Sequence, residues 1–246
     1  MQTTEPEALR AARAGVALCA SLDASQRAQC APGRLEAWAD DHRRVAAASP
    51  DDAAAARCLA EAADLLRLAG APAGDTLAYK LGVVELARAE RLHAVGDIAE
   101  AQAAYATAAE AWLALEQRGS ALFTPELIDL LANTRFARAQ LLLALTEPVS
   151  AARLAALAAT DWARAAVASG AEPSPARLDA LANAHAFQGV ALRMAGDGAG
   201  ALQSLEQAET LWDALERQLG DATPDGLRQR LALARAQLAE LDPSRA

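Results

Sequence analysis

Apolar residues recur at intervals of three and four along most of the chain, the spacing that places them on one face of an α-helix. Between Arg34 and Ala48, for example, Leu35, Trp38, His42 and Val45 follow this spacing. Residues 21–33 have no clear pattern, and Pro32-Gly33 interrupts them. The pattern predicts other helices over residues 4–20, 53–69 and 224–241, the first capped by Thr4.

A helical hairpin from Gly82 to Ala114 recurs along the chain at a period of 50 residues. Its turn is Gly96-Asp97, in which Gly ends one helix in a left-handed conformation and Asp caps the next. The equivalent residues are Thr146-Glu147 and Gly196-Asp197, and Trp112, Trp162 and Trp212 are spaced in the same way. Self-similarity at a fixed period indicates an α-solenoid, in which repeated helix pairs stack to bury a shared core.

Small residues occupy equivalent positions in the three copies, where we expect helices to cross closely. These sets are Ala89, Ala139 and Gly189; Ala101, Ala151 and Ala201; and Ala108, Ala158 and Ala208. The Trp residues are interpreted as core anchors and not as an exposed patch. We therefore predict an all-α fold of about 10–11 helices, organised as an N-terminal helical cap with a degenerate repeat (1–74), repeats over 75–123, 124–172 and 173–222, and a C-terminal capping helix with a tail (223–246).

Composition and charge restrict the partners. The net charge of −9 argues against nucleic acid, whose binding requires clustered Lys and Arg. No segment reaches about 18 apolar residues without a charge, so no membrane span is expected. The acidic N-terminus does not resemble a signal peptide, and the three Cys are expected to be free thiols. We expect a cytoplasmic protein.

The repeat resembles the tetratricopeptide repeat family over about residues 75–220. The resemblance lies in the small residue at Ala89, the large one at Leu92, the Gly96-Asp97 turn and the Ala sets of the second helix. It implies a right-handed α-solenoid that binds a peptide or helix in a concave groove lined by each first helix. The repeat departs from the family in its length, 50 residues against the usual 34, and in the polar residues at two first-helix positions: Glu85/Arg88, Arg135/Arg138 and His185/Gln188.

The resemblance places the groove on one stripe of each first helix. In the first copy the groove residues are Tyr79, Val83, Leu86, Glu90 and His93. The second copy supplies Asp129, Asn133, Phe136, Gln140 and Leu143, and the third supplies Asp179, Asn183, Ala186, Val190 and Arg193.

Asn133 and Asn183 are the most informative of these residues, because Asn is a poor mid-helix residue and yet recurs at one position. An amide can donate and accept, so the pair could hold the backbone of a bound peptide. A bond to a neighbouring helix, or simple duplication, would also account for them.

No pattern indicates catalysis, a metal or a cofactor. Glu90 and His93 form one E-x-x-H, but the two-metal helical sites need a second copy, and the equivalents are Gln140/Leu143 and Val190/Arg193. We therefore expect a non-catalytic scaffold, monomeric or homodimeric, whose partner is a peptide, tail or helix of another protein. Two alternatives remain open: a peptide- or ligand-responsive sensor, and an enzyme with a site around Asp40, Asp41, His42 and the cysteines.

Overall fold

The computed structural model describes residues 6–71, 73–170, 172–242 and 244. That part of the chain contains eleven α-helices, one 3₁₀ helix and no β-strand, which confirms the all-α fold and the expected number of helices. The chain divides into two compact units, Met1–Phe123 and Thr124–Ala246. The division falls at the predicted boundary between the first and second repeats.

The first unit contains helices α1 to α6. Consecutive longer helices pack against each other, α1 on α3, α3 on α4, α4 on α5 and α5 on α6. Leu35, Trp38, Leu59 and Leu66 belong to one hydrophobic core. The bounds are α1 Glu7–Ala20, α2 Ala24–Ala28, α3 Pro32–Ala47, α4 Asp52–Leu68, α5 Asp75–Ala94 and α6 Ile98–Gln117.

Two features of the first unit differ from the sequence prediction. Residues 24–28 form a short helix, stabilised by a capping box between Asp23 and Gln26. Pro32 begins α3 and does not break it, because a residue without an N–H is tolerated in the first turn of a helix. The predicted cap at Thr4 lies outside the described residues.

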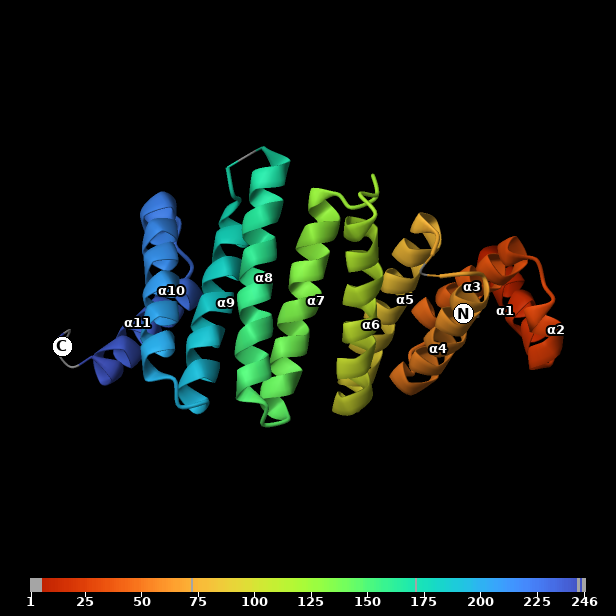
Figure 1. Cartoon of the computed structure of the whole chain (residues 1–246), viewed down its shortest axis with the longest axis horizontal. Coiled ribbons are helices and arrows are strands. Elements are labelled where there is room, and N and C mark those ends of the chain that lie inside the picture. Colours follow the sequence, from red (N-terminus) through yellow and green to blue (C-terminus); the bar gives the residue numbers. More distant parts are fainter. Residues whose placement is uncertain (1–5, 72, 171, 243, 245–246) are drawn as a thin grey trace, which may run out of the picture. The chain divides into compact units, whose positions relative to one another are not determined.

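The second unit contains α7 to α11, and its helices also pack in the order of the sequence (Figure 1). Leu227 and Leu231 of α11 are buried with Trp212 and Leu215 of α10, so the predicted amphipathic last helix does pack on the preceding pair. This sequential packing is that of a helical-repeat stack. The bounds are α7 Pro125–Ala144, α8 Pro148–Ser169, α9 Pro175–Met194, α10 Gly198–Leu219, a 3₁₀ helix Gly220–Ala222 and α11 Asp225–Leu241.

The three inter-helix turns share one backbone geometry. The residue at Gly96, Thr146 and Gly196 has a positive φ in each case, and the next N–H donates to the carbonyl five residues earlier, as in a Schellman motif. Thr146 adopts φ 61° despite its branched Cβ, so the middle turn holds a residue that disfavours this conformation. Asp97 and Asp197 cap the following helices, whereas Glu147 makes no cap bond.

Burial confirms the role assigned to the small residues and to the Trp series. The Ala residues of all three sets are 0% exposed, and a Cβ on Gly189 would lie 2.8 Å from Cγ of Leu205. Trp112, Trp162 and Trp212 are 0%, 4% and 2% exposed, as expected of core anchors. Trp112 also donates its indole N–H to the carbonyl of Tyr79 at 3.4 Å.

Candidate binding pocket in the second unit

A pocket of about 530 Å³ lies in the second unit, with lining residues from α7, α9 and α11. Phe136, Phe187, Val190 and Leu233 supply much of its apolar surface. The side chains of Trp162 and Trp212, from α8 and α10, also border it. The volume falls in the range of about 300–1,000 Å³ that is typical of ligand sites in proteins.

Helical spacing explains which side chains of α7 and α9 line the pocket. Asn133, Phe136 and Gln140 follow each other at intervals of three and four, so they share one face of α7. On α9 the same face carries Ala176, Ala180 and Ala186, whose small side chains leave the space open. This α9 face also carries Asp179, Asn183, Phe187 and Val190.

Aromatic contacts fix the orientation of Phe136 in the lining of the pocket. Its ring lies 5.8 Å from that of Trp162 and 5.4 Å from that of Phe187, both in edge-to-face geometry. Such pairs add about 0.5–1.5 kcal/mol to the energy of burial. Phe136 is therefore held by neighbours on α8 and α9.

Amide side chains supply most of the polar groups around this apolar surface. In the described part of the chain, Asn133, Gln140 and Gln237 make no side-chain hydrogen bond, so their donors and acceptors are available to a ligand. Asn183 differs, because its Nδ2 donates to the carbonyl of Asp179 at 2.7 Å. Its Oδ1 is left to accept.

The charged residues of the lining neutralise each other. Asp179 accepts from Nη2 of Arg230 at 2.8 and 2.9 Å and from the indole N–H of Trp212 at 2.9 Å. The Arg230 guanidinium also lies 6.0 Å from the centre of the Trp212 ring, within cation–π range. The pocket therefore offers an apolar, amide-edged surface without net charge.

The structure brings together the predicted groove residues of the second and third copies. Asn133, Phe136, Gln140, Asn183 and Val190 all line the pocket, together with Ala186. Arg193 does not, and instead forms an ion pair with Glu240 of α11 at 3.1 Å.

The residues predicted in the first copy belong to the first unit and are not part of this pocket. Tyr79 is 40% exposed. Glu90 and His93 are also exposed on α5, and Leu86 is half-buried. The first-copy stripe therefore stays a prediction.

Several pocket residues were not foreseen. Phe187 lies next to the predicted Ala186 and is one of only three Phe in the chain, which is a signal that sequence reasoning could have used. Arg230, Leu233 and Gln237 come from α11, which was treated only as a cap. Trp162 and Trp212 were interpreted as core anchors; they are core residues, and they also border the pocket.

The residues of the enzyme alternative lie in the first unit, where Cys19 is part of the hydrophobic core and Cys30 and Cys58 pack against it. His42 is 5% exposed and neither ring nitrogen has a hydrogen-bond partner, and burial lowers its pKa. Asp40 pairs with Lys80 and Asp41 with Arg44. Among the described residues, no group of three His, Cys, Asp or Glu is placed to hold a metal ion, and no helix is long and apolar enough to span a membrane.

Comparison with known proteins adds little to this picture. No family model matches the sequence, and no curated protein matches it. BtubC (BKLC) from P. vanneervenii is 14% identical over 86% of this chain and 93% of its own, with a TM-score of 0.42. A de novo designed helical repeat protein, DHR64, is 15% identical over 97% of this chain and 96% of its own, with a TM-score of 0.30. TM-scores this low support no functional inference.

Proposed function

We propose that the second unit is a non-catalytic interaction module that binds an uncharged, apolar segment of another protein in the α7–α9–α11 pocket. The convergence of equivalent positions from two repeats on one aromatic-lined pocket is the observation that carries this proposal. The bound segment would be a peptide, a tail or one face of a helix. The acidic net charge of the chain is poorly suited to nucleic acid.

The chemistry of the lining supports an apolar side chain as the anchor of that segment. Each Å² of apolar surface removed from water contributes about 25 cal/mol, and the two Phe rings and Leu233 offer such surface. The free amides of Asn133 and Gln140 can pair with main-chain groups of the segment. A charged anchor would lose hydration without gaining a partner, because Asp179 and Arg230 already neutralise each other.

A relation to the tetratricopeptide repeats belongs to the same proposal. It is supported by the shared geometry of the three turns and by the buried small residues at equivalent positions. In that family the groove is lined by first helices, and the pocket here is lined mainly by α7 and α9, the first helices of two copies.

A peptide library displayed on phage tests the proposed partner class. Selection on the whole protein should enrich uncharged sequences with an aromatic or large aliphatic residue. The enriched peptides should lose about tenfold or more in affinity for a Phe187→Ala variant, because the truncation removes a wall of an apolar site. Val167→Asp, on an exposed side chain of α8 outside the pocket, is the matched control.

The paired substitution of Asn133→Ala with Asn183→Ala tests the amides. We expect most of the loss to come from Asn133, because Asn183 already donates to its own helix. Unchanged affinity in the double variant, or an equal loss in Val167→Asp, would show that the peptide binds elsewhere.

The volume of the pocket supports a second candidate, a sensor for a small apolar molecule. Binding would then move α11 relative to α9 and change the surface offered to a second protein. Small-angle scattering with and without a ligand found by thermal-shift screening distinguishes the two. An unchanged scattering curve at saturation would count against a sensor.

A further inference from the structure

A second recess of the unit, the α8–α10 groove, lies between α8 and α10 with α9 as its floor. It consists of two adjoining cavities of about 520 and 470 Å³ that share Leu181, His185, Gln203 and Gln207. At 3.6 residues per turn, Leu181 and His185 lie on the face of α9 opposite Asn183. The α8–α10 groove is thus separate from the pocket of the proposed function.

Hydroxyl groups make the α8–α10 groove rich in acceptors. Thr160 donates its hydroxyl proton to the main-chain carbonyl of Ala156 at 3.0 Å, and Thr210 donates to the main-chain carbonyl of Glu206 at 2.8 Å. Ser204 donates to Gly200 at 2.9 Å. A hydroxyl has one proton, so these three oxygens can only accept from a ligand.

His185 adds a further acceptor to the floor. Gln188 hydrogen-bonds the imidazole, and burial lowers the pKa of His185, so the ring is neutral near pH 7. Its Nδ1 is buried and has no partner. With the proton on the other nitrogen, Nδ1 accepts.

The remaining polar groups of the α8–α10 groove are compatible with a donor-rich ligand. Gln203 and Gln207, one turn apart on α10, make no side-chain hydrogen bond in the described part of the chain and can each turn a carbonyl toward a ligand. Glu206 also lines the groove, and none of the described lining residues is a Lys or an Arg. The groove therefore matches a cation with many N–H donors.

In the first unit a cavity between α4 and α6 overlaps the equivalent position, 100 residues earlier. Ala56, Ala60 and Arg88 line it in place of Ala156, Thr160 and Gln188. Its volume is about 250 Å³.

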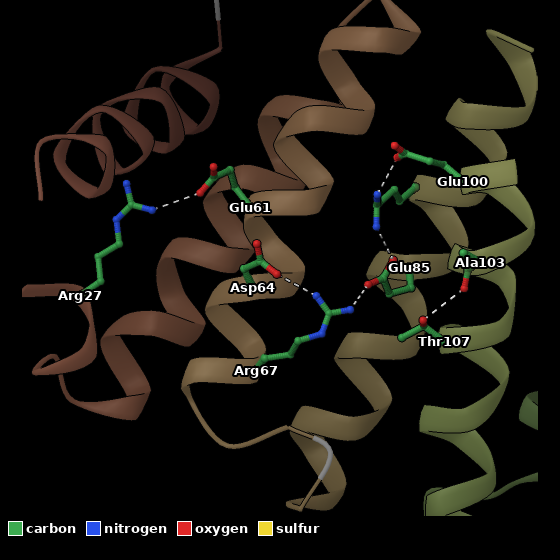
Figure 2. A network of polar contacts seen from close by, with 9 residues as sticks. Arg27, Glu61, Asp64, Arg67, Glu85, Glu100, Ala103 and Thr107 are labelled. Atoms are coloured by element: carbon green, nitrogen blue, oxygen red, sulfur yellow. Dashed lines mark hydrogen bonds and ion pairs between the residues drawn. The ribbon is translucent and has the colours of Figure 1, made fainter. Parts of the chain in front are cut away.

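An arginine of the chain itself, Arg88, forms part of the wall of this first-unit cavity. Arg88 donates to Glu85 at 3.4 Å and to Glu100 at 3.0 Å, and so connects α5 to α6. Figure 2 shows Glu85 and Glu100 within this network. The counterparts of Glu85, Arg88 and Glu100 in the second unit are His185, Gln188 and Gly200, and among the described residues no arginine lines the larger groove.

We propose that the α8–α10 groove binds a guanidinium group, supplied by an arginine side chain of another protein or by a free arginine-like molecule. A guanidinium has five N–H donors and no acceptor, which matches the hydroxyl, imidazole and amide acceptors from three helices. Its flat apolar faces can lie against Leu181 and Leu211. This proposal does not rest on the function proposed for the other pocket.

Titration of the whole ¹⁵N-labelled protein with N-acetyl-L-arginine amide tests the site by NMR. We expect saturable shifts at α8, α9 and α10 residues that line the groove. N-acetyl-L-citrulline amide has nearly the same shape without the charge, and it should bind about tenfold more weakly or less. Absence of saturable binding, or equal affinity for the two amides, would overturn the proposal.

Two variants of the protein test whether the probe binds in the α8–α10 groove. Gln188→Arg places an arginine in α9 at the position equivalent to Arg88 of α5. The new side chain should occupy the α8–α10 groove, so the affinity for the probe should fall about tenfold or more. Gln203→Leu with Gln207→Leu should have the same effect by removing acceptors. Gln237→Leu, on the other pocket, is the control and should leave the affinity unchanged. Wild-type affinity in both groove variants, each with wild-type circular dichroism, would refute the assignment.

The source of the guanidinium is tested by comparing the affinities of free L-arginine and of N-acetyl-L-arginine amide. Tighter binding of L-arginine than of the capped amide supports the site and indicates a small molecule. Tighter binding of the amide supports the site and indicates a side chain within a polypeptide.

Discussion

The ion pairs of Glu85 lead to a prediction about stability: two different substitutions in this cluster should change the free energy of unfolding by very different amounts. Glu85 is 0% exposed and is paired with Arg67 of α4 and Arg88 of its own helix (Figure 2). The two arginines are 40% and 23% exposed, and they also pair with Asp64 and Glu100. Loss of both arginines would leave the buried carboxylate without these partners, whereas loss of the carboxylate would leave each arginine with another partner and with access to water.

Replacing both arginines by Ala leaves a buried carboxylate without a partner. Loss of the partners of a buried charge costs about 3–5 kcal/mol of the free energy of unfolding. Glu85→Met instead removes the buried charge and keeps most of the volume, while Arg67 and Arg88 retain water and their other partners. We expect Glu85→Met to change stability by about 1 kcal/mol or less, in either direction.

The triple substitution gives the sharpest test. With Arg67→Ala and Arg88→Ala in place, adding Glu85→Met should recover about 2–4 kcal/mol, because the unpaired charge is gone. Urea denaturation followed by circular dichroism at constant m-value measures each difference. Arg44→Ala, which breaks an exposed pair with Asp41, should cost about 0.5 kcal/mol or less. The reasoning fails if Glu85→Met costs as much as the loss of both arginines, or if the triple variant shows the sum of the separate losses.

Three further predictions concern stability. Thr146→Gly should raise the free energy of unfolding by about 1 kcal/mol in urea titrations, because Gly accepts the positive φ of this turn; a loss would mean that the Thr side chain stabilises the turn. Gly82→Ala should lower it by about 1–3 kcal/mol, since the new Cβ would overlap the indole of Trp112; a shift in Trp fluorescence should accompany the loss. Burial lowers the pKa of His42 in the folded chain, so the unfolded chain binds its proton more readily and stability should fall as pH drops through about 6.5. His42→Leu should flatten that dependence, and an unchanged slope would exclude His42 as its source.

Features that repeat along the chain could be predicted from the sequence. The 50-residue period predicted the hairpins, their turns and the burial of the Trp series, because each depends on local conformation and on helical spacing. Helical spacing likewise places Asn133, Phe136 and Gln140 on one face of α7, whereas the expectation that this face lines a groove came from the family resemblance. A residue three or four positions from another lies on the same helix face whatever the neighbouring helix does.

Contacts between distant helices could not be predicted in this way. Arg177 reaches Asp129 from 48 residues away and Arg230 reaches Asp179 from 51. These pairings depend on how far each helix rotates about its own axis and on side-chain rotamers, which periodicity does not determine. The contribution of α11 to the pocket was missed for this reason.

The attachment of α11 has a practical consequence for anyone who handles this protein. One wall of the pocket is the last helix, and Arg230 and Arg193 connect it to α9 through partly exposed ion pairs that salt weakens. An affinity tag or a fusion partner attached directly after Leu241 would disturb the packing of α11. Binding measured on such a product, or in a high-salt buffer, would understate the affinity of the pocket, so tags are better placed at the other terminus.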